Sequence, residues 1–239
     1  MKRLTWVMGT CLVLLLLIST SKGSVAGVVI EQMMKDREGK ASKVVLYVSA
    51  DQIRTDDEGS GLTTIADFKG DRMVMIDHGS RQYVEVRLSQ WEKEVASGLR
   101  KAVPPIFPRQ RKIVVKKTGE TAIIHGFKTE KIQILADGEL IEEDWVTRDL
   151  DMREFEKVMD RADQSFSKEF RSEMKEGREI HEKLRPHGFP IRIRDFAATY
   201  GLGGVDVLEV KRIEQKELKA EVFAPPAGYK RVIPESPKK

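Results

Sequence analysis

Histidine and carboxylate side chains are the groups in this chain that could act as acids, bases or metal ligands. The chain has 4 histidines, and none belongs to the HExxH or HxH patterns in which spacing brings two ligands onto one metal ion. His125 is the most interesting of them, because it lies in a predicted strand ahead of Gly126 and near Glu130. We interpret it as ordinary strand polarity, with a ligand or acid–base role as the alternative.

Paired acids are the other candidates for catalysis. Asp56-Asp57 and Glu142-Glu143-Asp144 fall in strand-like segments, where adjacent side chains point to opposite faces of a sheet. We therefore predict that these acids are surface residues. The chain has no GxSxG nucleophile motif and no asparagine. The sequence favours a protein that is not an enzyme, with no catalytic residues, no metal site and no cofactor.

Methionine and aromatic side chains give a stronger indication of function, because they point to a hydrophobic binding cavity. Methionine is unbranched and adaptable, so a surface rich in methionine suits acyl chains or varied apolar partners. We predict that such residues from different segments face one hydrophobic cavity, and a helix stripe packed as plain core against a sheet is the alternative. The candidate cavity residues are Met73, Met75, Trp91, Phe155, Met159 and Phe166.

The elements that would position these residues follow from the hydrophobic pattern. Short β-rich runs separated by glycine and aspartate turns fill Gly27 to Val86 and predict an antiparallel meander. Apolar residues then recur at spacings of three and four, which predicts an amphipathic helix over Leu88–Ala102. Three further strands follow up to about Asp149.

The segment Asp151–Leu184 has the longest helical periodicity. A continuous helix of this length would reach roughly 50 Å, so we predict a break at Gly177 or within Asp163–Ser167. Two more strands and an extended end complete the fold, and residues 234–239 are predicted to be disordered. The pattern predicts about ten antiparallel strands with two inserted helical segments, an α+β arrangement in which helices cover a curved sheet.

The N-terminus has the features of an export signal: basic residues, an apolar run from Trp6 to Ile18, and a small-residue cleavage pattern ending at Ala26. We predict a signal peptide over residues 1–26, a single domain over 27–233, and no stable membrane anchor after cleavage. The only cysteine, Cys11, leaves with the signal, so disulfides are excluded from the mature chain.

The charge balance argues against nucleic acid as a partner. Loss of three basic residues with the signal leaves 39 basic residues against 38 acidic ones, a net charge of about +1. The tract Arg100–Lys117 is the one clearly basic patch, and we interpret it as a solvated linker and strand edge.

Several segments in order carry a resemblance to a known family: RMVMIDHGSRQYVEV, TGETAIIHGFKTEKIQI, ELIEEDWVTRDL and the FAPPAGYKRV ending. With these segments the chain resembles domain-of-unknown-function family 4412, over nearly the whole mature length. The family looks related to the LolA and LolB type of periplasmic lipoprotein carriers. The resemblance implies an open antiparallel half-barrel covered by helices, with a cavity for acyl chains, and no binding residue of the carriers can be matched here.

These observations predict a periplasmic binding protein for a lipid, a lipoprotein acyl chain or another hydrophobic ligand, held between the sheet and its helices. The alternative is a protein-binding or sensor module that uses the same groove, or the charged helical segment Asp151–Leu184, to hold another envelope protein.

Overall fold

The structure is a computed structural model that describes residues 24–36, 40–102, 111–196 and 205–233. The predicted signal peptide up to residue 23, the predicted disordered tail 234–239 and the proline-rich part of the basic tract lie outside the described residues. The strands are β1 (Ser24–Asp36), β2 (Ala41–Ser49), β3 (Gln52–Asp57), β4 (Leu62–Asp67), β5 (Arg72–Asp77), β6 (Gln82–Arg87), β7 (Ile113–Ile124), β8 (Phe127–Ala136), β9 (Glu139–Thr147), β10 (Phe189–Asp195), β11 (Val205–Lys219) and β12 (Lys230–Val232). The helices are α1 (Leu88–Ala102), α2 (Arg153–Ser165), α3 (Lys168–Glu173) and α4 (Lys175–Leu184), with short 3-10 turns η1 (Arg185–His187) and η2 (Ala220–Phe223).

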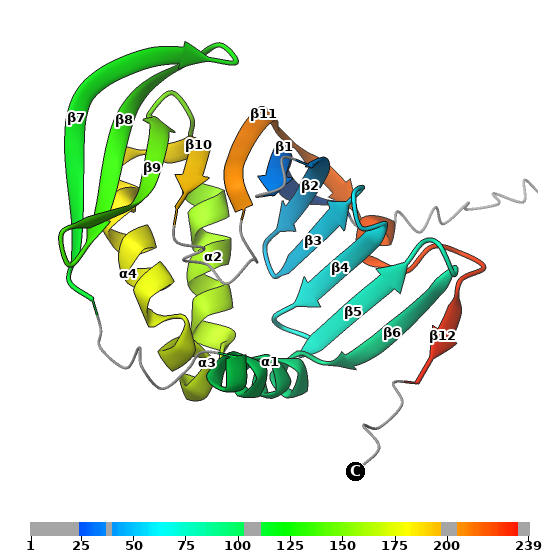
Figure 1. The fold of residues 1–239 in the computed structure, drawn as a ribbon. Coiled ribbons are helices and arrows are strands. Elements are labelled where there is room, and N and C mark those ends of the chain that lie inside the picture. The colour runs from blue at the N-terminus through cyan, green and yellow to red at the C-terminus, as the bar shows by residue number, and fades with distance from the viewer. Residues whose placement is uncertain (1–23, 37–39, 103–110, 197–204, 234–239) are drawn as a thin grey trace, which may run out of the picture.

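All 12 described strands form one sheet, in the order β12-β6-β5-β4-β3-β2-β1-β11-β10-β9-β8-β7 (Figure 1). Every neighbouring pair is antiparallel except β12 and β6, which run parallel through Lys230 to Val232. The predicted meander from β1 to β6 is therefore confirmed. Tight turns make it possible, and Asp71 at φ 48° and Arg81 at φ 54° adopt the left-handed conformation that such turns require.

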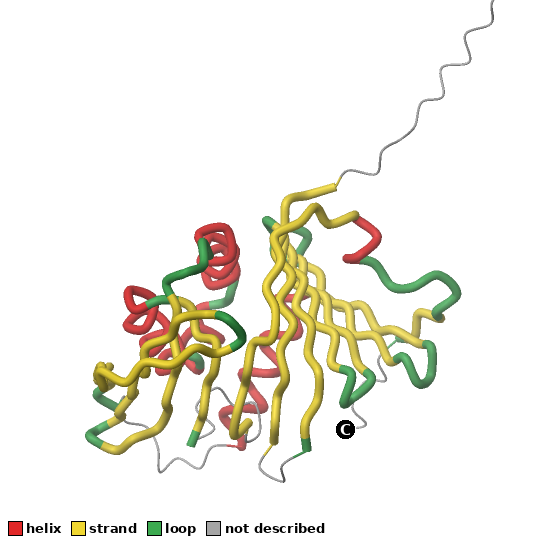
Figure 2. Tube along the Cα trace, turned by 90° about the horizontal axis from the view of Figure 1, so that it is seen from above, coloured by secondary structure: helices red, strands yellow, loops and turns green. Residues whose placement is uncertain are grey.

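The strands separate into two groups that spread apart when the molecule is seen from above (Figure 2). One group contains β1 to β6, β11 and β12, and the other contains β7 to β10. They join where β10 pairs with β11 at Arg192↔Glu209 and Ile193↔Leu208. By contrast, β1 and β11 pair along the whole length of β1, from Ser24 to Asp36.

Both faces of the first group are covered, because alternate side chains of a strand point to opposite faces. On one face Val28 and Ile30 pack with Met152 and Phe155 at the start of α2. On the other face Val29, with residues of β2, β4 and β5, packs against Phe223 of η2. The C-terminal segment, which the sequence predicted only as an extended end, therefore closes a second core.

The segment predicted as one interrupted helix forms three helices. The break within Asp163–Ser167 is confirmed, because α2 ends at Ser165 and the Ser167 hydroxyl accepts a hydrogen bond from the Phe170 backbone N–H to begin α3. A second break follows at Met174, while Gly177 lies inside α4. In Figure 1 α3 and α4 follow α2, and α1 lies beside α3.

The predicted fold class, a half-barrel covered by two helical segments, is wrong. Strands make up 54% of the structure and helices about 25%, and the sheet is not closed, so the fold is dominated by its sheet. The reason is the length of the strands: β1, β7 and β11 have 13, 12 and 15 residues. The short helices cover only part of such a sheet, and η2 covers another part.

Candidate functional site

Helix α2 lines two apolar hollows of the structure. Its residues Phe155, Val158, Met159 and Ala162 recur at spacings of three and four, which places them along one broad face of the helix. Val158 and Ala162 are buried, while Phe155 and Met159 are half-buried on either side of them. The helix can therefore present apolar side chains to two neighbouring hollows.

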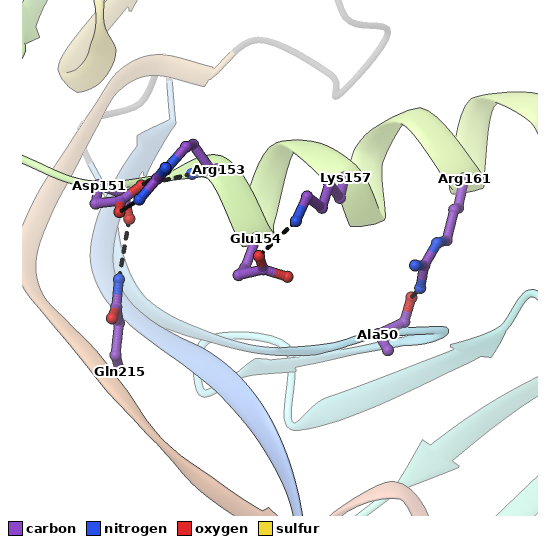
Figure 3. Close-up of polar contacts among 7 residues, drawn as sticks. All are labelled: Ala50, Asp151, Arg153, Glu154, Lys157, Arg161 and Gln215. Atoms are coloured by element: carbon purple, nitrogen blue, oxygen red, sulfur yellow. Dashed lines mark hydrogen bonds and ion pairs between the residues drawn. The ribbon is translucent and has the colours of Figure 1, made fainter.

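Polar contacts hold α2 to the sheet near both of its ends (Figure 3). The Gln215 side-chain amide on β11 donates to the Asp151 carbonyl at 2.9 Å, just before the helix begins. Near the other end the Arg161 guanidinium donates to the Ala50 carbonyl at 2.8 Å. These contacts are exposed, so they fix the position of the helix more than they stabilise the fold.

One hollow, the sheet groove, lies between α2 and strands β1, β2 and β11. Its volume is about 540 Å³. Apolar side chains dominate its wall, while Glu154 and Gln215 belong to its polar part. The apolar lining includes Val28, Val48, Phe155 and Val158, together with Val25, which the predicted cleavage after Ala26 would remove.

The other hollow, the helix cleft, lies between helices α2, α3 and α4 and the first group of strands, from which Ile53 of β3 and Phe68 after β4 contribute to its wall. Its volume is about 420 Å³, and its wall is mainly apolar. Phe166 is central to it, because its ring meets that of Phe68 edge-on at 6.2 Å and that of Phe170 at 4.9 Å. The apolar lining includes Ile53, Phe68, Met159, Phe166, Phe170 and Met174.

Charged residues form the rim of the helix cleft. Arg178 pairs with Asp163 at 2.5 Å, and Arg185 pairs with Asp160 at 3.0 Å. Arg185 also contacts Glu156 at 2.8 Å. The rim therefore ties α4 and η1 to α2 by ion pairs, and it leaves the apolar floor of the cleft open between them.

The structure divides the predicted cavity residues among different places. Met159 and Phe166 line the helix cleft, and Phe155 lines the sheet groove. Trp91 lies behind the cleft, where its ring packs against Phe170 at 6.1 Å, and it does not line either hollow. Met73 and Met75 on β5 also line neither hollow; Met73 is buried and Met75 is half-buried.

Two lining residues of the helix cleft have no signal in the sequence pattern. Ile53 lies on β3, and Phe68 lies in the turn after β4, where an aromatic side chain gives no periodic signal. Phe170 and Met174 carried a signal, because they continue the helical spacing of Phe166. Long-range packing therefore selects residues that the local pattern does not.

A cluster of buried acids lies beneath α4 in the second group of strands. Glu142 and Asp144 are both 0% exposed and Asp195 is 6% exposed, so the prediction that Glu142 and Asp144 are surface residues is wrong. Adjacent acids do point to opposite faces, but Glu142 and Asp144 are two residues apart and share the face that packs on Ile180 and Leu184.

Burial raises the pKa of Asp144 well above its ordinary value, and the negative charge of Glu142, a hydrogen bond that protonated Asp144 donates to Glu142, and the charge of Asp195 raise it further. Both carboxyl oxygens of Asp144 lack a hydrogen-bond donor when the group is ionised. The arrangement therefore favours a protonated Asp144 that shares its proton with Glu142.

His125 contacts Glu209 of β11 and not Glu130, the acid near it in the sequence. His125 lies in the turn between β7 and β8 with a φ of 49°. Its Nε2 atom lies 2.5 Å from the Glu209 carboxylate. Arg192 and Lys211 reach the same carboxylate at 2.8 and 2.5 Å. Partial burial opposes ionisation of Glu209, but the hydrogen bonds from Lys211, His125 and Arg192 outweigh it and lower the pKa of Glu209 to about 2.

Within the described residues, no group of three or more histidine, cysteine, aspartate or glutamate side chains is placed to hold a metal ion. None of the helices in the described ranges combines the length and apolar character needed to cross a membrane.

Two of the solved structures that this chain resembles are distant likenesses. The first is titled as an uncharacterized conserved protein from Thermus thermophilus, with 11% identity, a TM-score of 0.47, and coverage of 87% of this chain and 90% of that chain. The second is PNGF-II, with 12% identity, a TM-score of 0.37, and coverage of 87% of this chain but only 31% of that chain. Neither likeness is close enough to support an argument.

Comparison with curated proteins gives no match. The family model described as "Domain of unknown function (DUF4412)" matches residues 26–229, which is most of the sequence. The segments that carried the resemblance lie within this range, apart from the last three residues of the C-terminal one. This chain therefore belongs to the DUF4412 family.

Proposed function

We propose that this protein is a non-enzymatic binding protein for a lipid or another hydrophobic ligand, and that the helix cleft holds the ligand. One observation carries the proposal: a mainly apolar cleft of about 420 Å³ lies between α2, α3, α4 and the sheet. Ligand sites typically have volumes of about 300 to 1,000 Å³ and mainly apolar walls with a few polar groups.

The lining suits a flexible chain better than a rigid, polar molecule. Met159 and Met174 adapt their shape to a ligand, while Phe166 and Phe170 supply apolar area. Burying an acyl chain in such a cleft would contribute about 0.8 kcal/mol for each methylene removed from water.

The proposed location is the periplasm, with the signal peptide over residues 1–26 cleaved on export. The support is the sequence pattern of the N-terminus, since residues 1–23 lie outside the described residues. The relation to the LolA and LolB type of carriers is likewise proposed from the resemblance alone, and it supports lipid binding by analogy.

Native mass spectrometry of the exported protein tests the proposal. We expect a stoichiometric acyl-chain species in the wild type, and its loss in Phe166→Glu, which places a charge in the cleft. Phe196→Glu is the matched control, because Phe196 is 45% exposed and does not line the cleft. Wild-type protein that never carries lipid would contradict the proposal, and one dominant protein partner in crosslinking would favour the protein-binding alternative instead.

A further inference from the structure

Arg171, in the last turn of α3, differs from the other arginines of the helix cleft in its contacts. The acids that line the cleft are already engaged: Asp163 and Glu182 contact Arg178, and Asp160 contacts Arg185. The Arg171 guanidinium, in contrast, makes no hydrogen bond or ion pair with those residues whose side chains the structure describes, a set that does not include Glu169 and Glu173.

An arginine in this position has a distinct chemical capacity. A guanidinium carries five N–H donors and matches the geometry of carboxylate and phosphate oxygens. Arg171 is half-buried, so water screens it less than it screens a fully exposed side chain. It adjoins Phe170, which is buried at 7% exposure in the apolar wall.

We infer that the ligand of the helix cleft is a single-chain amphiphile with an anionic head, and that Arg171 binds this head while the apolar wall holds the chain. The inference rests on the proposed function and names the class of ligand for the same site. Charge complementarity carries it, because Arg171 is the arginine of the cleft wall whose donors have no acceptor among the side chains that the structure describes. A neutral apolar ligand would leave those donors unused.

Calorimetric titration with matched ten-carbon probes tests the inference. Decanoate and monodecyl phosphate carry anionic heads, and they also distinguish a carboxylate head from a phosphate head; 1-decanol has the same chain without the charge. At pH 8 we expect the wild type to bind at least one anionic probe about tenfold more tightly than 1-decanol. We expect Arg171→Gln to abolish this preference and to change 1-decanol affinity by less than about twofold.

Two variants control for altered structure. Arg178→Gln removes another arginine from the cleft wall, one that is already paired with Asp163, and it should keep the preference for the anionic probe. Arg171→Lys keeps a cation and should keep part of the preference even if Arg171→Gln folds poorly. Equal binding of charged and neutral probes by the wild type would overturn the inference and leave the proposed function standing. Binding of neither class would overturn both.

Discussion

Two carboxyl clusters lie on opposite faces of the sheet, on strands β9 and β11 that β10 separates, and their pKa values shift in opposite directions. Asp144 on β9 faces α4, where burial and the neighbouring acids Glu142 and Asp195 raise its pKa. Glu209 on β11 faces the other side with three cationic or polar donors around it, and its pKa is lowered to about 2. The contrast shows that neighbours and burial, rather than residue type, decide whether a carboxyl favours or resists ionisation.

The packing of α4 over Asp144 should have the largest effect on the stability of the protein. Ile180 of α4 is 0% exposed and packs on Ile132 and Ile134 beside the acids. We expect Ile180→Ala to lower the free energy of unfolding by about 2 to 5 kcal/mol, because it leaves a cavity in a closed core. Urea denaturation measures the loss. Val114→Ala is the control, since Val114 is 43% exposed and should change stability by less than about 0.5 kcal/mol.

Replacing Asp144 by valine should remove the energetic cost of burying this carboxyl group. We expect Asp144→Val to raise the free energy of unfolding by about 1 to 4 kcal/mol at pH 8, because an apolar group of similar size replaces a buried acid without a cationic partner. Glu143→Val alters the neighbouring acid on the opposite face and should have a much smaller effect. A less stable Asp144→Val protein at pH 8 would contradict the assignment of Asp144 as a buried acid without a cationic partner.

The same acid gives a pH dependence with a defined sign. Because the pKa of folded Asp144 lies above its unfolded value of about 3.8, its contribution to stability is complete below that value and is lost as pH rises through the folded pKa. Denaturation of the wild type over a pH series should therefore show a decline towards alkaline pH. Asp144→Val should flatten this decline, and an unchanged profile would assign the decline to other groups.

Glu209 should change the free energy of unfolding less than Asp144 does, and its contribution should depend on pH in the opposite direction. Because its pKa is lowered from 4.5 to about 2, it contributes stability that is present above pH 4.5 and is lost as pH falls through about 2. After a discount for partial exposure, we expect Glu209→Gln to lower the free energy of unfolding by about 1 to 2 kcal/mol at pH 7. Glu120→Gln, which removes an exposed pair with Lys131, should change it by less than about 0.5 kcal/mol. A deficit that persists unchanged down to pH 2 would argue against the ionic origin.

Local signals were sufficient for much of the fold. The hairpins from β2 to β6, helix α1 and the break before Ser167 follow from turn residues and apolar spacing, which act over a few positions. The closure of the second core by Phe223 did not follow, because its partners on β2, β4 and β5 lie far away in the sequence. The predicted fold class was wrong for a different reason, the length of strands β1, β7 and β11.

The candidate site was predictable only in part. Met159 and Phe166 stood out because they lie on a clear helical stripe, whereas Phe68 lies in a turn and has no such signal. The burial of Asp144 was hidden for a different reason. A charged residue on a strand ordinarily faces water, and only the packing of α4 over this part of the sheet reverses that expectation.

The two ends of the sheet also bear on how these molecules behave in concentrated solution. At one end β12 is only 3 residues long and offers few unpaired backbone groups. At the other end β7 has 12 residues, but its pairing register shifts between Lys117 and Thr121, and Lys116 and Lys117 are exposed along it. A short edge, an irregular edge and exposed lysines are devices that discourage strand pairing between molecules. The long sheet therefore ends in edges that oppose self-association into fibres.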